Sequence, residues 1–258
     1  MSVWSTRRQL AFVAFFVVLL ALGVAGLLYF NQEVPTCTDG LTNQSELGVD
    51  CGGPCIRICP VETNELVILW TRIFKVREGV YDVAALVENP NPFGVVSADY
   101  KIRVYDADNL PVKDIEGSTY LNPHERFLVF EPNVDVGFRT PTRAFLTFDN
   151  DLDWRRLGPA RKPDLRVGSY VITNTPILSL KSSVNNMSIF NVENVEVVAI
   201  LSDGQANATH VSRTFIDSLN EDATKEIVFT WPNVKDDKVV GVLILPRVDL
   251  VTANLLAR

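Results

Sequence analysis

Residues 87–109 of the 258-residue chain read VENPNPFGVVSADYKIRVYDADN. Near the end of this stretch, Tyr100, Ile102 and Val104 alternate with Lys101 and Arg103. Apolar residues at every second position are typical of a strand with one buried face. A run of Asn and Pro precedes the strand and a run of Asp and Asn follows it, and both compositions favour turns. The stretch therefore predicts a strand of an antiparallel sheet with a turn at each end.

The alternating pattern recurs further along the chain, and no amphipathic helix of useful length lies between the predicted strands. Apolar residues occupy every second position in two more runs: Val195, Val197, Ala199 and Leu201, and then Ile227, Phe229 and Trp231. Each run predicts another half-buried strand. Short strands separated by turns favour antiparallel sandwiches. We therefore expect an all-β region made of two tandem Ig-like antiparallel β-sandwiches.

Features of the first stretch are repeated, which predicts an internal duplication. Asn89 precedes Asp106 by 17 residues, and Asn186 precedes Asp203 by the same 17. Further correspondences link residues 120–122 with 218–220 and residues 130–133 with 230–233. A duplicated unit of about 90–100 residues has the size of one sandwich domain. Residues 159–163 contain two prolines, which do not continue a strand, so we place a linker there between sandwiches at 61–158 and 164–258.

The N-terminal region predicts a membrane segment. Leu10–Phe30 is uncharged and has no polar face, and roughly 20 apolar residues suffice for a helix to cross the ~30 Å core of a bilayer. Arg7 and Arg8 precede it, and no Lys or Arg follows before Arg57. This asymmetry predicts a cytoplasmic tail at 1–9, a transmembrane helix at 10–30 in the cell membrane and an extracytoplasmic remainder. The alternative is a cleaved signal peptide, but its apolar core usually has about 7–15 residues, so the length favours a retained signal anchor.

All four cysteines, Cys37, Cys51, Cys55 and Cys59, lie in the next segment, residues 31–60. Outside the cytosol, an even and clustered set of cysteines predicts two disulfides. Three connectivities are possible, and the spacing does not choose among them. A zinc or iron–sulfur site is the alternative, but the spacing from Cys51 onward is not typical of either.

Four oxygen-bearing side chains lie between the cysteines: Asp39, Asn43, Glu46 and Asp50. Carboxylate and amide oxygens are calcium ligands, so this loop is a candidate calcium site. Calcium is the one candidate cofactor. The spacing does not follow the EF-hand pattern. The alternative is a solvated acidic loop with Asx turns at Asp39 and Asn43.

Two parts of the sequence resemble known families. The cysteine segment is similar to an element C-x-D-G-x-x-N-x-x-E-x-x-x-D-C-G-G-x-C found in exported bacterial and archaeal proteins of varied architecture. Residues 87–109 resemble the start of the FxLYD and late-embryogenesis-abundant type-2 group of sandwich domains. The second resemblance implies a sandwich fold and an interaction or stress-protective role, and it carries over no functional residues.

The sequence offers little material for catalysis or for nucleic-acid binding. The formal net charge is −7, so no excess of basic residues is available to neutralise phosphates and we expect no nucleic-acid partner. His124 and His210 are the two histidines, and the chain lacks G-x-S-x-G, H-E-x-x-H, C-x-x-C and phosphate-loop motifs. We therefore expect no enzyme and assign no catalytic or cofactor-binding residue.

Three asparagines, Asn43, Asn186 and Asn207, begin N-x-S/T sequons, which matter only if the host glycosylates exported chains. At Asn186, a role as a turn residue is the stronger interpretation.

Together these observations favour a non-catalytic, single-pass membrane protein. Residues 10–30 would contact the lipid bilayer, and the tandem sandwiches would bind an envelope or extracellular protein or support envelope structure, since exposed sheet edges are common docking sites. The alternatives are a stress-protective protein similar to the late-embryogenesis-abundant group or an envelope hydrolase.

Overall fold

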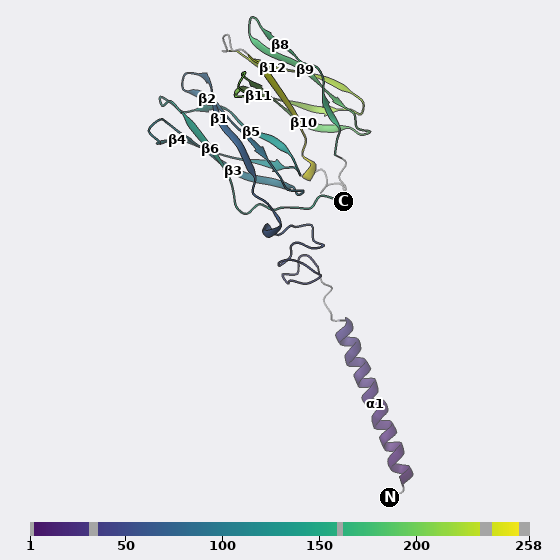
Figure 1. The fold of residues 1–258 in the computed structure, drawn as a ribbon. Helices are drawn as coiled ribbons and strands as arrows, with labels where there is room; N and C mark the ends of the chain where they lie inside the picture. Colours follow the sequence, from purple (N-terminus) through teal and green to yellow (C-terminus); the bar gives the residue numbers. More distant parts are fainter. Residues whose placement is uncertain (1–2, 31–35, 159–161, 233–238, 253–258) are drawn as a thin grey trace.

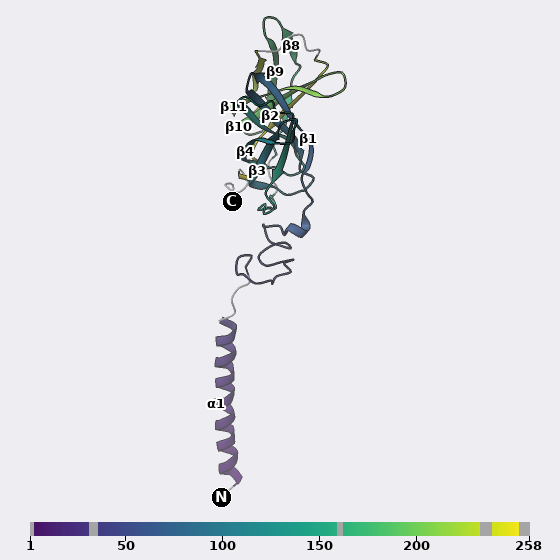
Figure 2. The same ribbon diagram turned by 90° about the vertical axis from the view of Figure 1, so that its left-hand side faces the viewer.

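The computed structural model describes residues 3–30, 36–158, 162–232 and 239–252. Helix α1, Val3–Phe30, is long and apolar enough to cross a membrane. It starts seven residues before the predicted span. Figures 1 and 2 show the cysteine segment between α1 and a β region at the far end of the molecule.

The first sandwich has two antiparallel sheets of three strands each. One sheet has the order β1-β2-β5 and the other β4-β3-β6. The strands are β1 Val67–Arg77, β2 Val80–Glu88, β3 Val95–Tyr105, β4 Pro111–Leu121, β5 Arg126–Asp135 and β6 Arg143–Phe148. As predicted, Tyr100, Ile102 and Val104 of β3 point into the core, while Lys101 and Arg103 lie on the outer face.

The second sandwich repeats this arrangement. Its sheets have the orders β11-β10-β13 and β12-β9-β7, and β8 also pairs with β9. The strands are β7 Leu165–Val167, β8 Val171–Asn174, β9 Leu178–Asn186, β10 Val192–Ser202, β11 Ala208–Leu219, β12 Thr224–Trp231 and β13 Gly241–Arg247. The prediction of an all-β region with two antiparallel sandwiches behind an apolar helix is confirmed, and the narrower Ig-like assignment stays a prediction.

A buried asparagine fixes the same corner in each sandwich. The Nδ2 group of Asn89 donates hydrogen bonds to the carbonyl oxygens of Phe93 and Asn122, at 2.9 and 2.7 Å, and its Oδ1 accepts one from the N–H of Asn91 at 3.0 Å. Asn186 makes the corresponding three bonds at 2.9, 3.0 and 3.0 Å. Both asparagines are fully buried, so their amides satisfy main-chain groups that water does not reach.

The strand predicted at 195–201 is present in β10, but the prediction that it is half-buried is wrong. Val198 and Ile200, which lie between the predicted core residues, are 1% and 5% exposed. They are buried because the outer face of this sheet packs against the first sandwich. The central strand β10 is therefore buried on both faces.

The chain after β13 returns to the first sandwich. The N–H of Leu250 donates to Oδ1 of Asn122 at 3.0 Å, and Nδ2 of Asn122 donates to the carbonyl of Val248 at 2.8 Å. Val251 is fully buried against Gly94, where an added Cβ would lie only 2.6 Å from the valine methyl. The predicted linker at 159–163 therefore lies between the two sets of strands, but residues 248–251 at the end of the second set contact the first sandwich.

Candidate interaction cleft between the sandwiches

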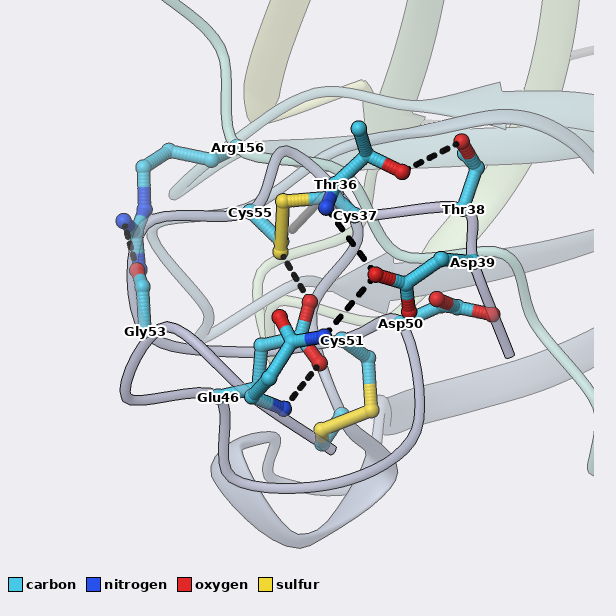
Figure 3. Close-up of a disulfide and its surroundings, with 12 residues drawn as sticks. Thr36, Cys37, Thr38, Asp39, Glu46, Asp50, Cys51, Gly53, Cys55 and Arg156 are labelled. Atoms are coloured by element: carbon cyan, nitrogen blue, oxygen red, sulfur yellow. Dashed lines mark hydrogen bonds between the residues drawn. A yellow bond between two sulfur atoms is a disulfide. The ribbon is translucent and has the colours of Figure 1, made fainter. Parts of the chain in front are cut away.

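The cysteine segment is cross-linked by two disulfides, Cys37–Cys55 and Cys51–Cys59 (Figure 3). The predicted number of disulfides is confirmed. The structure selects one of the three connectivities that the spacing left open.

Three of the four proposed calcium ligands, the carboxylates of Asp39, Glu46 and Asp50, already accept hydrogen bonds from the protein, whereas the buried Oδ1 of Asn43 has no hydrogen-bond partner among the described residues. Asp39 accepts bonds from Nδ2 of Asn43 at 2.8 Å and from two backbone N–H groups, and both oxygens of Asp50 accept the N–H of Gly40 at 3.0 and 3.1 Å. Glu46 accepts the N–H of Asn43 at 3.3 Å. The bond from the N–H of Leu41 to Oδ1 of Asp39 forms one of the two Asx turns that were the alternative to calcium binding, and the turn expected at Asn43 is not formed because its Oδ1 accepts no hydrogen bond from the described part of the chain.

The same bonds explain an electrostatic feature of the loop. The backbone N–H of Thr36, then the Asn43 amide and the N–H of Leu41, lower the pKa of the Asp39 carboxyl because they stabilise its charged form. The calcium site stays a prediction. A calcium-dependent rise in melting temperature that Asp50→Asn abolishes would support it, and an unchanged melt would favour the turn alone.

Glu46 also lies close to sulfur, without forming a metal site. Its Oε1 is 3.0 Å from Sγ of Cys55 (Figure 3). The Sγ atoms of Cys37 and Cys55 both lie within 4.8 Å of this carboxylate, but they form a disulfide with each other, so neither is a thiolate that can bind a metal ion.

The cysteine segment is paired with the first sandwich. The N–H of Ile58 donates to the carbonyl of Trp154 at 2.8 Å, and both side chains are buried in the core of that sandwich. The N–H of Arg156 donates to the carbonyl of Ile56 at 2.7 Å, and its guanidinium donates to the carbonyl of Gly53 at 2.8 Å (Figure 3). The segment is therefore held against the sandwich by main-chain pairing as well as by covalent continuity.

The two sandwiches share an apolar interface. The sheet β1-β2-β5 of the first packs against the sheet β11-β10-β13 of the second, so each contributes its outer face. The buried residues at the contact are Ala84, Leu86, Leu128 and Phe130 on one side and Val198, Ile200 and Val211 on the other. Burial of these side chains is favourable because it removes apolar surface from water.

A buried arginine adds polar contacts to this interface. The Arg247 side chain, from β13, is 4% exposed and donates to the carbonyl of Tyr120 at 2.7 Å and to Oε2 of Glu125 at 3.1 Å. Its guanidinium carbon lies 3.8 Å from the centre of the Tyr120 ring, and Nη1 is 3.8 Å from Glu196 of its own sandwich. Burial raises the pKa of Tyr120 above its usual range, and the Arg247 charge opposes part of this rise.

Another contact joins β1 to the start of β11. Arg72 donates to the carbonyl of Ala208 at 3.0 Å and to Oδ1 of Asn207 at 2.9 Å. Two of the sequon asparagines therefore have structural roles. Asn207 lies at the interface. Asn186 is fully buried, which supports its interpretation as a turn residue, since a buried amide is closed to modification in the folded chain.

A cleft opens beside the apolar interface. One cavity of about 380 Å³ is lined from the first sandwich by Phe74, Asp82, Phe130 and Pro132, among others, and from the second by His210, Arg213, Phe215 and Trp231. A neighbouring cavity of about 620 Å³ shares Phe74, Lys75 and His210 with it and continues past Arg72 to Arg143. We call these two adjacent cavities the inter-sandwich cleft.

The aromatic walls of the cleft are held in place by specific contacts. Nε1 of Trp231 donates to the carbonyl of Val211 at 2.9 Å, and the His210 ring meets the Trp231 ring edge-on with centres 6.2 Å apart. The guanidinium carbon of Arg213 lies 5.6 Å from the Phe130 ring centre and 5.3 Å from that of Phe215.

The sequence patterns do not predict this cleft, although His210 and Trp231, which both line it, stand out in the sequence as a histidine and as an apolar strand residue. His124, the other histidine, is exposed in the turn before β5. The internal repeat could have indicated the interface beside the cleft. Positions that should face solvent in both copies, such as Lys101 and the corresponding Val198, are polar in one copy and apolar in the other. Comparison of the sequence with models of known protein families gives no match, and comparison with curated proteins gives none either.

Proposed function

We propose that this chain is a non-catalytic, single-pass membrane protein that holds two joined β-sandwiches outside the cytoplasm for binding to another protein. The observation that carries the proposal is the pairing of all four cysteines into disulfides in the segment that follows α1. Disulfides persist in oxidising compartments, and α1 supplies an apolar span of the required length. Arg7 and Arg8 before the span favour a cytoplasmic N-terminus and a retained signal anchor.

The joined sandwiches support a role in presentation. The apolar interface, the Arg247 contacts and the docked residues 248–252 favour one body with a constant shape, and a preorganised surface loses less entropy on binding a partner. The cysteine segment, cross-linked and paired with the first sandwich, would keep this body near the bilayer.

The proposal includes an evolutionary origin. The matching strand orders and the matching Asn89 and Asn186 contacts support a duplication of one ancestral sandwich, of Ig-like type and similar to the FxLYD and late-embryogenesis-abundant type-2 group. The exported-protein resemblance of the cysteine segment supports the same location.

Two measurements on the full chain test the function. Alkylation of intact cells with a membrane-impermeant reagent should label the cysteines only after reduction. Cysteines that stay unlabelled in intact cells after reduction, but react once the cells are lysed, would contradict the location. Crosslinking followed by purification in detergent should recover a stoichiometric protein partner. Recovery of the chain without a partner would contradict presentation, and substrate turnover by the purified chain would favour the hydrolase.

A further inference from the structure

The inter-sandwich cleft combines an aromatic cavity with a basic end. Phe74, Phe130, Phe215 and Trp231 contribute apolar surface to the smaller cavity, whose volume of about 380 Å³ lies in the range of small-ligand pockets, roughly 300–1,000 Å³. Such a cavity accommodates one or two bulky apolar side chains of a partner.

The charge of the cleft differs from that of the whole chain. The chain carries a net charge of −7, yet the cleft is lined by the cations Arg72, Lys75, Arg143 and Arg213. Among the described residues that line it, Asp82 is the one acidic residue. Its carboxyl accepts the N–H of Asn133 at 2.8 Å.

The partners of these cations leave part of their charge available to a ligand. Arg213 is 3.2 Å from Glu196 and Lys75 is 2.8 Å from Glu78, so these two charges are partly balanced. Arg72 bonds to two neutral oxygens. After the backbone N–H of Asn207 as the main cause, the Arg72 charge also helps to lower the pKa of the Asp203 carboxyl, so this cation is partly balanced as well. Arg143 is exposed at the start of β6. The larger cavity, lined by Arg72, Lys75 and Arg143, has no acidic residue among its lining residues.

From this arrangement we propose that the inter-sandwich cleft binds an acidic segment of a partner protein, with carboxylates at the Arg72–Arg143 end and a bulky apolar side chain in the aromatic cavity. This inference rests on the proposed function and names the site and the chemistry of its partner. Complementary charge favours the choice, because an acidic ligand meets repulsion over most of this acidic protein and attraction at the cleft. Two adjacent cavities that share Phe74, Lys75 and His210 match an extended segment better than a single compact molecule.

The experiment uses the full chain in nanodiscs to select from a displayed library of random linear 12-residue peptides. The expected consensus contains at least two acidic residues and one bulky apolar residue. Selected peptides should bind at least tenfold more weakly to Phe215→Ser and to Arg143→Glu, and more weakly as salt concentration rises. Phe215 is 59% exposed and Arg143 is exposed, so both variants should keep the wild-type melting temperature.

Two variants outside the cleft serve as matched controls. Phe145→Ser removes a phenylalanine that is 57% exposed on β6, and Lys181→Glu reverses an exposed cation on β9. Both should bind the peptides within twofold of wild type. No enrichment, a consensus without acidic residues, or equal binding by all variants would overturn the inference.

Failure of this inference is distinguishable from failure of the proposed function. A crosslinked partner retained by Phe215→Ser and by Arg143→Glu would leave presentation intact and exclude the cleft as its site. The absence of any partner with the wild-type chain would count against presentation itself.

Discussion

The outer faces of β3 and β10 occupy the same place in their sandwiches but have opposite chemistry. Each strand is the centre of a three-stranded sheet. When the two copies are aligned at Asn89 and Asn186, Lys101 corresponds to Val198, and Arg103 corresponds to Ile200. On β3 these positions carry ion pairs, with Lys101 and Arg103 both bound to Asp114. On β10 they are buried in the interface.

The faces of β2 and β9 differ in the reverse sense. Ala84 and Leu86 of β2 are buried against the second sandwich, whereas the corresponding Lys181 and Ser183 of β9 lie on a solvated face. Each sandwich therefore has one apolar and one polar outer face, and the two apolar faces meet each other. A contact between unlike faces of two similar units can repeat and form a filament. Here the two remaining outer faces are polar, so no third sandwich adds to the pair.

The largest effect should come from giving β10 the outer residues of β3. In the double variant Val198→Lys with Ile200→Arg, two charges without partners enter the interface, and we expect a loss of more than about 4 kcal/mol of unfolding free energy or separation of the sandwiches. Denaturant unfolding and limited proteolysis between the sandwiches measure both outcomes. Lys101→Arg with Arg103→Lys, which keeps both charges on the solvated face, is the control and should unfold at nearly the same denaturant concentration as wild type. Wild-type stability in the β10 variant would mean that the sandwiches do not pack through this face.

Removal of one buried cation should cost somewhat less. Arg247→Ala leaves Glu125 and Glu196 without their shared partner, and we expect a loss of about 3 kcal/mol or more in unfolding free energy. Arg103→Ala removes an arginine from an ion pair whose side chains are 47% and 37% exposed, so its effect on unfolding should be much smaller than that of Arg247→Ala. Equal losses in these two variants would contradict the difference between the faces.

The corner asparagines should have similar effects in the two sandwiches. Asn89→Ala and Asn186→Ala each leave buried main-chain groups without partners, so we expect a loss of about 2–3 kcal/mol in unfolding free energy for each. Chemical denaturation measures these losses. A large loss for one variant and none for the other would show that the two corners are not equivalent.

The smallest effect concerns pH. The backbone N–H of Asn207 is the main cause that lowers the pKa of Asp203, followed by the N–H of Gln205, so the charged carboxylate is favoured in the folded state. Its contribution is present above the unfolded pKa, near 4, and is lost as pH falls through the lower folded value. The difference in melting temperature between wild type and Asp203→Ala should therefore shrink as pH falls below about 4. A difference that is constant from pH 7 to pH 2 would contradict this role.

Local patterns predicted the elements that depend on local chemistry. The alternation at 100–104 located β3 because one face of that strand meets solvent, and the uncharged run at 10–30 located α1 because no polar residue interrupts it. The number of disulfides followed from the count of cysteines. Their connectivity did not, because the backbone path through Gly52 and Gly53 decides which sulfurs meet.

The interface could not be predicted from alternation because burial on both faces removes the alternation. The run Val197–Leu201 is continuously apolar, which fits a strand covered on both sides, but its cover comes from β2 and β5, more than 60 residues earlier in the chain. The cleft beside it depends on the relative placement of the sandwiches, which pairwise contacts such as Arg72 with Asn207 determine.

The central claim is that the two sandwiches form one body. Its most direct test is a distance measurement by pulsed electron resonance between spin labels introduced through non-canonical amino acids at Asp108 and Lys181, both exposed, in the full chain in nanodiscs. We expect one narrow distance distribution in wild type, and we expect it to broaden when Val198→Lys and Ile200→Arg are combined. A broad distribution in the wild-type chain would contradict this claim.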